Sequence, residues 1–219
     1  MTNHFYSPAT NSVYHYLLEQ ILSGALKPGD KVPETSIAQV LNVSRTPVRD
    51  ALRELAAANV VTLYPNKYSE ISVFDENRMR EAGVTKVTLD RFAIRLAVYY
   101  GSRAEYEELR RLAEICYQKA LENDFAARIS ADSDFHLELC RITKNRTLLQ
   151  IERILLIQLE YLQAANYLNA DDPEAQYASH LRIVDALERG DTAAGMEAIT
   201  SPSLGFYRVG GIPLDLLEG

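Results

Sequence analysis

Three arginines recur at intervals of four residues in the first half of the chain, at Arg45, Arg49 and Arg53. On a helix, this spacing places the three side chains on one stripe. Like charges four residues apart repel, and cations at the start of a helix oppose its dipole, so the stripe costs stability. A polyanion bound from outside turns that cost into attraction, and the arginine fork fits phosphates and guanine edges. The stripe is therefore a candidate surface for reading DNA, with a solvated basic face as the plain alternative.

A second group of residues has the chemistry of a metal site. Asp132 and His136 lie four residues apart, so both side chains leave one face of a predicted helix, and His180 lies on a later one. A carboxylate and two imidazoles can bind a divalent transition metal and leave coordination positions open. Histidines on helices are more often packed in the core or placed at the surface, so both interpretations stay open.

The arginine stripe lies within a pair of short predicted helices. A first helix is predicted over Ser12 to Ser23 and a second over Glu34 to Leu41. Asn42 tolerates the left-handed conformation that ends a helix, and Ser44 can cap a third helix, with Pro47 in its first turn. Two short helices joined by so tight a turn form a helix-turn-helix, and base contacts are usually made by the start of its second helix.

A predicted β-hairpin follows the helix-turn-helix. Residues 60–64 and 70–74 are strand-like, and they flank a turn that contains Pro65 and Asn66. A helix-turn-helix followed by a hairpin is a winged helix. Lys67, near the tip of this hairpin, is placed to reach a phosphate or the minor groove, although a single loop lysine is usually only solvated.

The rest of the chain has helical periodicity almost throughout. Asp75 can cap a new helix, so we expect a domain boundary there, with residues 1–75 as one domain and residues 76–219 as the other. The predicted fold is mainly α, an N-terminal winged helix-turn-helix plus a C-terminal antiparallel bundle of about six helices. The breaks between these helices are predicted at Gly101, Asn123, Lys144, Asp172 and Gly190.

Composition limits the classes of protein to consider. The chain has 219 residues, of which 47% are hydrophobic and 24% charged, as is ordinary for globular proteins. No apolar run approaches the roughly 20 residues that span a bilayer, no secretory signal is visible, and two cysteines make no disulfide framework. We therefore expect a cytoplasmic protein without a membrane partner. The formal charge of −7 argues against non-specific coating of nucleic acid, but it allows a local basic reading head.

The run Ser44-Arg45-Thr46-Pro47-Val48-Arg49, preceded by Pro33-Glu34-x-x-Ile37-Ala38, resembles the DNA-binding domain of the GntR family of bacterial transcriptional regulators. The resemblance covers roughly residues 12–73, and it implies that Arg45, Thr46 and Arg49 contact the operator, with Arg53 on the DNA backbone. The family's wing tip usually carries glycine where this chain has Tyr68. The predicted DNA-binding residues are Ser44, Arg45, Thr46, Arg49, Arg53 and Lys67.

The second half resembles the FCD ligand-binding domain of the FadR-like branch of that family, and six helices suggest the VanR-type subgroup. Asp132, His136 and His180 match its pattern, in which an aspartate and three histidines often hold Zn, Ni or a similar ion and a small organic acid completes the shell. The third histidine belongs near position 202, where this chain has Ser201-Pro202-Ser203, so three of four ligands are kept. A proline there is expected to break the helix. Lys86 stands where the family often has an arginine facing the effector cavity, and it can pair with a carboxylate.

Together these resemblances imply a homodimeric, ligand-responsive transcriptional regulator, a repressor rather than an enzyme. Its partners would be a near-palindromic double-stranded DNA operator and a small carboxylate effector, with a divalent Zn or Ni ion as cofactor. Two alternatives stay open. One is a metal-dependent helical enzyme whose ion activates water, and the other is a helical ligand-binding module without DNA activity.

Overall fold

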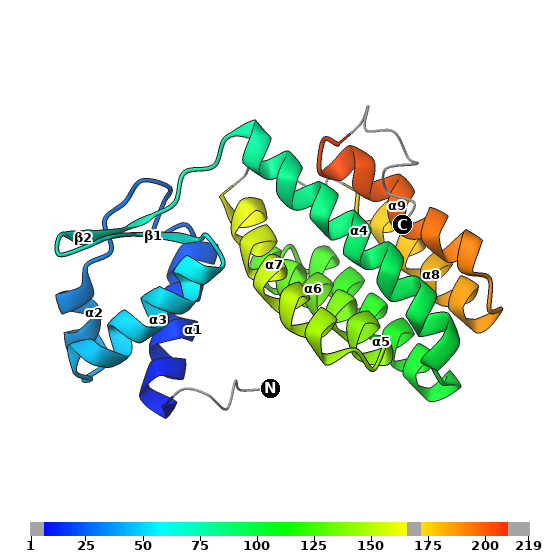
Figure 1. Ribbon diagram of the computed structural model, residues 1–219, viewed down its shortest axis with the longest axis horizontal. Coiled ribbons are helices and arrows are strands. Elements are labelled where there is room, and N and C mark those ends of the chain that lie inside the picture. The colour runs from blue at the N-terminus through cyan, green and yellow to red at the C-terminus, as the bar shows by residue number, and fades with distance from the viewer. Residues whose placement is uncertain (1–6, 166–171, 210–219) are drawn as a thin grey trace. The chain divides into compact units, whose positions relative to one another are not determined.

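The structure is a computed structural model that describes residues 7–165 and 172–209. These residues are mainly helical, with one two-stranded sheet (Figure 1). They form two compact units. The first contains residues 7–74 and 157–165, and the second contains residues 75–156 and 172–209. The predicted fold class, a winged helix-turn-helix followed by a helical bundle, is confirmed.

The helices of the first unit begin and end largely where the sequence places them. They are α1 (Pro8–Leu22), α2 (Glu34–Val40) and α3 (Arg45–Ala57). Helix α1 begins earlier than predicted, because the side chain of Ser7 caps it by accepting a hydrogen bond from the amide of Thr10. Asn42 has the left-handed conformation expected of it, with φ of 50°.

The wing is a hairpin of strands β1 (Val61–Tyr64) and β2 (Tyr68–Ile71), paired antiparallel. The second strand starts two residues earlier than the sequence suggests, because the turn between the strands contains only three residues. Asn66 has a φ of 58° in this turn, as tight hairpin loops require. In the same unit, the hydroxyl of Tyr161 donates a hydrogen bond to the carbonyl oxygen of Ser72.

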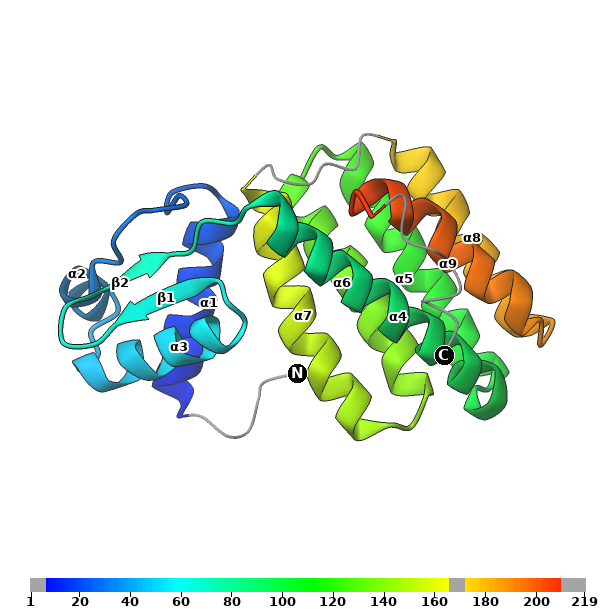
Figure 2. The ribbon, with the colours of Figure 1, turned by 45° about the horizontal axis from the view of Figure 1, so that its top comes forward.

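Six helices follow the wing in the described part of the chain, as predicted (Figure 2). Aspartate or serine side chains cap five of them, because each accepts a backbone N–H of the first turn. The sequence signals for these caps therefore predict the helix starts well. The six helices are α4 (Glu76–Tyr100), α5 (Arg103–Leu121), α6 (Phe125–Ile142), α7 (Arg146–Ala164), α8 (Pro173–Glu188) and α9 (Thr192–Phe206).

One prediction about the last helix is wrong. Pro202 does not break α9, which continues to Phe206. A proline has no N–H to bond the carbonyl four residues earlier, which is that of Ala198. The hydroxyl of Ser179 on α8 donates to this carbonyl instead, at 3.3 Å, so the helix passes the proline without leaving that acceptor unpaired.

The core of the second unit lies among α4, α5, α6, α7, α8 and α9. It is made of buried aliphatic and aromatic side chains, among them Ile94, Leu109, Phe135, Leu139 and Ile183. None of the helices in the described part of the chain combines the length and the apolarity that a bilayer crossing requires. The packed helices hold the polar residues of α6 and α8 in fixed positions near the core.

Candidate DNA-reading surface and effector cavity

The three predicted arginines lie on the outer face of α3. Their side chains keep 60%, 57% and 67% of full exposure at Arg45, Arg49 and Arg53. On the opposite face, Val48 and Leu52 are completely buried. The helix therefore presents a row of guanidinium groups to the outside while its apolar face anchors it, as a recognition helix requires.

The wing brings a fourth cation to the same surface. Arg45, Arg49, Arg53 and Lys67 line one groove of about 660 Å³ along α3 and the hairpin. Ser44 and Thr46 are exposed at the beginning of α3, where Ser44 occupies the N-cap position without making a side-chain capping bond. All six predicted DNA-binding residues therefore lie at the surface of the first unit.

A carboxylate that the sequence does not single out holds two of these arginines. Oε2 of Glu34, on α2, lies 3.4 Å from Nε of Arg49 and 3.9 Å from Nη2 of Arg45. Ser69 of the wing donates a hydrogen bond to Oε1 of Glu34 at 3.2 Å. Ion pairs of exposed side chains contribute little free energy, so a phosphate or base can compete for the arginines. No motif in the sequence indicates this pairing, because it depends on how α2 packs beside α3.

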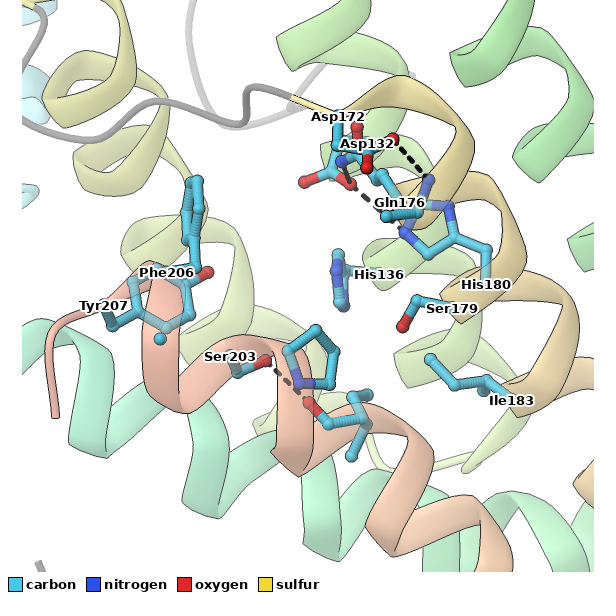
Figure 3. A pocket seen from close by; sticks show the side chains of 14 residues that line it. Asp132, His136, Asp172, Gln176, Ser179, His180, Ile183, Ser203, Phe206 and Tyr207 are labelled. Atoms are coloured by element: carbon cyan, nitrogen blue, oxygen red, sulfur yellow. Dashed lines mark hydrogen bonds and ion pairs between the residues drawn. The ribbon is translucent and has the colours of Figure 1, made fainter. Parts of the chain in front are cut away.

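A cavity of about 380 Å³ lies among helices of the second unit (Figure 3). This volume is within the range of small-molecule sites. Figure 3 shows His136 between residues of α8, such as Ser179, and residues of α9, such as Ser203. The lining also includes apolar side chains. The polar lining residues are Asp132, His136, Asp172, Gln176, Ser179, His180, Ser203 and Tyr207.

Asp132 and His180 meet at one end of this cavity. Oδ1 of Asp132 lies 3.2 Å from Nε2 of His180, and Nε2 of Gln176 donates to the same oxygen at 2.7 Å. Burial raises the pKa of Asp132, but the hydrogen bond from His180 and the nearby charges lower it more, so the pKa lies below its usual value. The ring of Phe135 stacks on that of His180, with centroids 4.1 Å apart. The carboxylate is thus ionised and the imidazole firmly held.

His136 faces the cavity, but its Nδ1 belongs to a buried ionic cluster. Nζ of Lys86 lies 3.0 Å from this nitrogen, and Oδ1 of Asp90 lies 3.4 Å from it. Lys86 also pairs with Asp90 at 2.5 Å and with Glu152 at 2.8 Å. Burial lowers the pKa of Lys86, but the two carboxylates raise it more, so the ammonium stays charged. Lys86, predicted to face the effector, is fully buried and does not line the cavity.

The residues fit the expected metal site only in part. The spacing of Asp132 and His180 suits two ligands of one ion. Position 202, however, brings a proline ring to the cavity, where the pattern calls for an imidazole. A histidine that ligates a metal normally donates its other N–H to an acceptor, and the nearest group to Nδ1 of His136 is the ammonium of Lys86, which has no acceptor. Asp132, His136 and His180 therefore do not form a preorganised metal site.

A cysteine missed by the sequence analysis adds a different grouping. Among the described residues, donor atoms of Cys116, Asp132 and His180 lie within 4.8 Å of one another. Burial raises the pKa of the Cys116 thiol to about 12, and its sulfur contacts the carbonyl oxygen of Arg128 at 3.7 Å. The thiol is therefore protonated, and Cys116 does not line the cavity. A lone cysteine on a helix gives no sequence signal for such a grouping.

Comparison with known proteins agrees with the two units. Residues 9–67 match the family of bacterial regulatory proteins called the gntR family, and residues 84–201 match the FCD domain. A probable repressor of a D-xylose utilization operon from Paenarthrobacter nicotinovorans is 32% identical over 193 residues, which cover 87% of this chain and 83% of that protein. The chain belongs to the GntR family. Its first unit is thus a GntR-type DNA-binding domain, and its second contains an FCD domain.

Other members of the GntR family are similar over most of their length. The Nta operon transcriptional regulator of Aminobacter aminovorans is 29% identical, over 74% of this chain and 75% of that protein. Two solved structures share the fold. Escherichia coli McbR/YncC has a TM-score of 0.79 at 22% identity, covering 93% of this chain and 97% of that one. A GntR regulator from Rhodococcus sp. RHA1 has a TM-score of 0.75 at 20% identity, covering 94% and 100%.

Proposed function

We propose that this GntR-family protein is a ligand-responsive repressor that reads its operator with the arginine stripe of α3. The observation that carries the proposal is the groove in which Arg45, Arg49, Arg53 and Lys67 gather on one exposed face. The chain as a whole has a formal charge of −7, so a cluster of four cations on one face indicates a binding site for an anionic partner such as DNA. Arg45, Thr46 and Arg49 are placed to contact bases, while Arg53 and Lys67 are placed to contact phosphates.

Glu34 holds the arginines of α3 in a defined arrangement before DNA binds. Because it pairs with both Arg45 and Arg49, the two guanidinium groups are held near each other before DNA arrives. Their exposure leaves donors free for base edges and phosphates. A bidentate contact from one arginine to a guanine is worth about 1–3 kcal/mol of discrimination against the wrong base, whereas an exposed ion pair contributes about 0–1 kcal/mol. DNA can therefore rearrange the cluster at little cost.

We further propose that the protein acts as a homodimer on a near-palindromic operator. Large apolar side chains are exposed on two helices, with Phe92 and Tyr99 on α4 and Ile151 and Ile154 on α7. Nζ of Lys86 on α4 reaches Glu152 on α7, so the two helices are neighbours. Phe92 and Tyr99 are seven residues apart and Ile151 and Ile154 are three apart, so each pair lies on one face of its helix. Exposed apolar faces mark interaction surfaces, and the commonest closed assembly is a two-fold dimer. A two-fold protein imposes its symmetry on the DNA site.

The second domain is proposed to sense a small metabolite in the cavity between α6, α8 and α9. We infer a boundary near residue 75, with residues 1–75 binding DNA and residues 76–219 binding effector and partner subunit. The six helices of the described part support placement in the VanR-type subgroup. The family resemblance suggests a small organic acid held through Zn or Ni. The proposal does not require that ion. Pro202 occupies the place of the third histidine, and the ammonium of Lys86 lies where Nδ1 of His136 needs a hydrogen-bond acceptor.

The relative from P. nicotinovorans is named as a repressor of a sugar utilization operon. By analogy, we propose control of catabolic genes here. Ligand control requires different effector affinities for DNA-competent and DNA-incompetent arrangements of the protein. A metal-dependent helical enzyme and a ligand-binding module without DNA activity stay as alternatives. The exposed arginine groove favours the regulator over both.

Capture of genomic DNA fragments by the full-length protein tests this function. We expect enrichment of a few sites, each an inverted repeat whose half-sites are separated by whole helical turns. The matched control is the Arg45→Ala/Arg49→Ala protein, which should lose the enrichment while its circular dichroism stays unchanged. Capture of unrelated fragments to the same extent by both proteins would contradict the proposal.

A further inference from the structure

The hydrogen bond between Lys86 and His136 fixes which nitrogen of the imidazole carries a proton. A lysine ammonium only donates hydrogen bonds, so Nδ1 of His136, at 3.0 Å from Nζ of Lys86, must accept. Burial and Lys86 lower the pKa of His136, but Asp90 and Asp132 raise it more, so the pKa lies above its usual value. Both the protonated ring and a neutral ring that accepts at Nδ1 carry a proton at Nε2. His136 lines the cavity, so it presents an N–H to the cavity and no lone pair.

A metal ligand needs the opposite arrangement. To coordinate an ion from the cavity, His136 requires a free lone pair on Nε2 and a proton on Nδ1, donated to an acceptor behind it. Asp90 is such an acceptor, but it lies farther away, at 3.4 Å, and its Oδ1 is engaged with Lys86. The ammonium is itself held in place by Asp90 and Glu152, and all three side chains are buried.

We propose that the cavity binds its effector without a metal ion, because the buried Lys86 ammonium holds His136 in the tautomer that donates to the ligand. The ligand is an uncharged, hydroxyl-rich small molecule. This inference rests on the proposed function, in that it takes the cavity to be the effector site. It differs from the family expectation in both the cofactor and the charge of the ligand.

The charge of the cavity wall supports an uncharged ligand. Among the residues that the structure describes, no lysine or arginine lines the cavity. Asp132 and Asp172 both contribute carboxylates to the wall. The nearby guanidinium of Arg128 is buried and donates to Oε1 of Gln176, and it does not line the cavity. A carboxylate ligand would therefore meet like charges on a wall that presents no lysine or arginine to pair with, which is unfavourable in a partly buried site.

The hydrogen-bonding groups of the wall suit hydroxyls. Ser179 and Ser203 donate their own protons to the carbonyl oxygens of Ala198 and Ile199, so their hydroxyl oxygens are left as acceptors. His136 adds a donor. Hydroxyl groups can both donate and accept, and they match such a mixed wall. Apolar side chains cover the carbon skeleton of a bound ligand on the remaining wall, at Ile183, Ile199, Pro202 and Phe206.

The first test is the tautomer of His136 in the full-length protein. Nitrogen-15 NMR of the histidine rings, assigned with His136→Gln, should show a proton on Nε2 of His136. A proton on Nδ1 alone would overturn the proposal. The tautomer is read from the native protein, and His136→Gln serves only to assign the ring signals of His136.

The second test is metal affinity, measured by Co(II) titration of the chelator-treated protein. The wild type should show no site-specific absorption. The double variant Lys86→Met/Glu152→Gln removes the buried ammonium together with the carboxylate that it pairs with. Asp90 is then free to accept a hydrogen bond from Nδ1 of His136, so Co(II) affinity should rise about 10–100-fold. Adding His136→Gln to this pair should remove the gain. Wild-type Co(II) binding that is lost in His136→Gln would overturn the proposal.

Cys116 provides a separate outcome of the same titration. A thiolate-to-cobalt charge-transfer band that is lost in Cys116→Ser and kept in Cys140→Ser would place a metal at Cys116, Asp132 and His180, and it would overturn the metal-free site. Cys140 is the matched control because it is also a buried, free cysteine.

The third test addresses ligand charge by thermal shift in the presence of EDTA. D-xylose, D-ribose and xylitol are compared with succinate, malate and benzoate. At least one polyhydroxy compound should raise the melting temperature, and His136→Gln should reduce that shift. Stabilisation by the carboxylates alone, or by no polyhydroxy compound at millimolar concentration, would reject the ligand class. Operator binding is measured on the same samples, because its loss would instead contradict the proposed function.

Discussion

Arg53 extends the reading surface one turn beyond Arg49, and it pairs with Asp50 on its own helix. If it contacts a phosphate, Arg53→Ala should weaken binding to all DNA sequences by a similar factor. It should also reduce the slope of log affinity against log salt by about 1, because one fewer counterion is released. Fluorescence anisotropy over a salt series measures this slope.

The control for this experiment is Arg103→Ala, which removes an exposed arginine from α5 in the effector domain. It should leave the slope unchanged. A loss of sequence discrimination in Arg53→Ala, with the slope unaltered, would instead assign Arg53 to a base contact.

Tyr161 makes a buried hydrogen bond whose contribution to stability can be measured. Its side chain is 1% exposed and its hydroxyl donates to the carbonyl oxygen of Ser72. Tyr161→Phe leaves that buried acceptor unpaired, so the free energy of unfolding should fall by about 1–3 kcal/mol. Urea unfolding of the full-length protein measures it. Tyr100→Phe, at a tyrosine that is 50% exposed and is not used in the proposed dimer surface, should change nothing, and an equal effect of both substitutions would refute the assignment.

At the residue scale, spacing predicts only what a helix itself brings together. The four-residue interval of Arg45, Arg49 and Arg53 was enough to predict the stripe. The pairing of Glu34 with two of them comes from the packing of α2 beside α3, so no local pattern contains it. In the same way, Lys86 and Asp90 are four residues apart on α4, but Glu152 and His136 join them from other helices.

At the scale of elements, capping residues and turn formers predicted most helix ends. Asp75, Asp172 and Asn42 behave as their side chains dictate. Pro202 does not break α9 as expected, because the hydroxyl of Ser179 on α8 donates to the carbonyl of Ala198 in place of the missing backbone N–H. The strand limits of the wing shifted for a related reason, since the length of the turn sets the register, and strand propensity does not.

The continuity of α9 depends on the hydroxyl that replaces the missing N–H of Pro202. Ser179→Ala should therefore lower the free energy of unfolding by about 1–3 kcal/mol, because the carbonyl of Ala198 loses its donor. In a Pro202→Ala background the backbone N–H returns, so the same substitution should cost less. The double-mutant cycle, measured by urea unfolding, should show a coupling of about 1 kcal/mol. Additivity within about 0.5 kcal/mol would contradict this explanation.

At the scale of the whole molecule, the proposed dimer surface makes a distinct prediction. Phe92→Glu places a charge on an exposed apolar side chain of α4. A charge buried without a partner is costly, so the dimer should dissociate at more than tenfold higher protein concentration in analytical ultracentrifugation, and operator affinity should fall in parallel. Leu121→Glu is the control, since Leu121 is also exposed but ends α5. Equal dimer stability in both variants would place the interface elsewhere.

The central claim concerns the outer face of α3, and anisotropy titration of the full-length protein with its own upstream DNA tests it most directly. We predict salt-sensitive binding by the wild type, a loss of about 1–3 kcal/mol in Arg49→Ala, and binding by Arg103→Ala equal to that of the wild type. Failure of the wild type to bind this DNA at low salt, or equal binding by Arg49→Ala, would contradict the account.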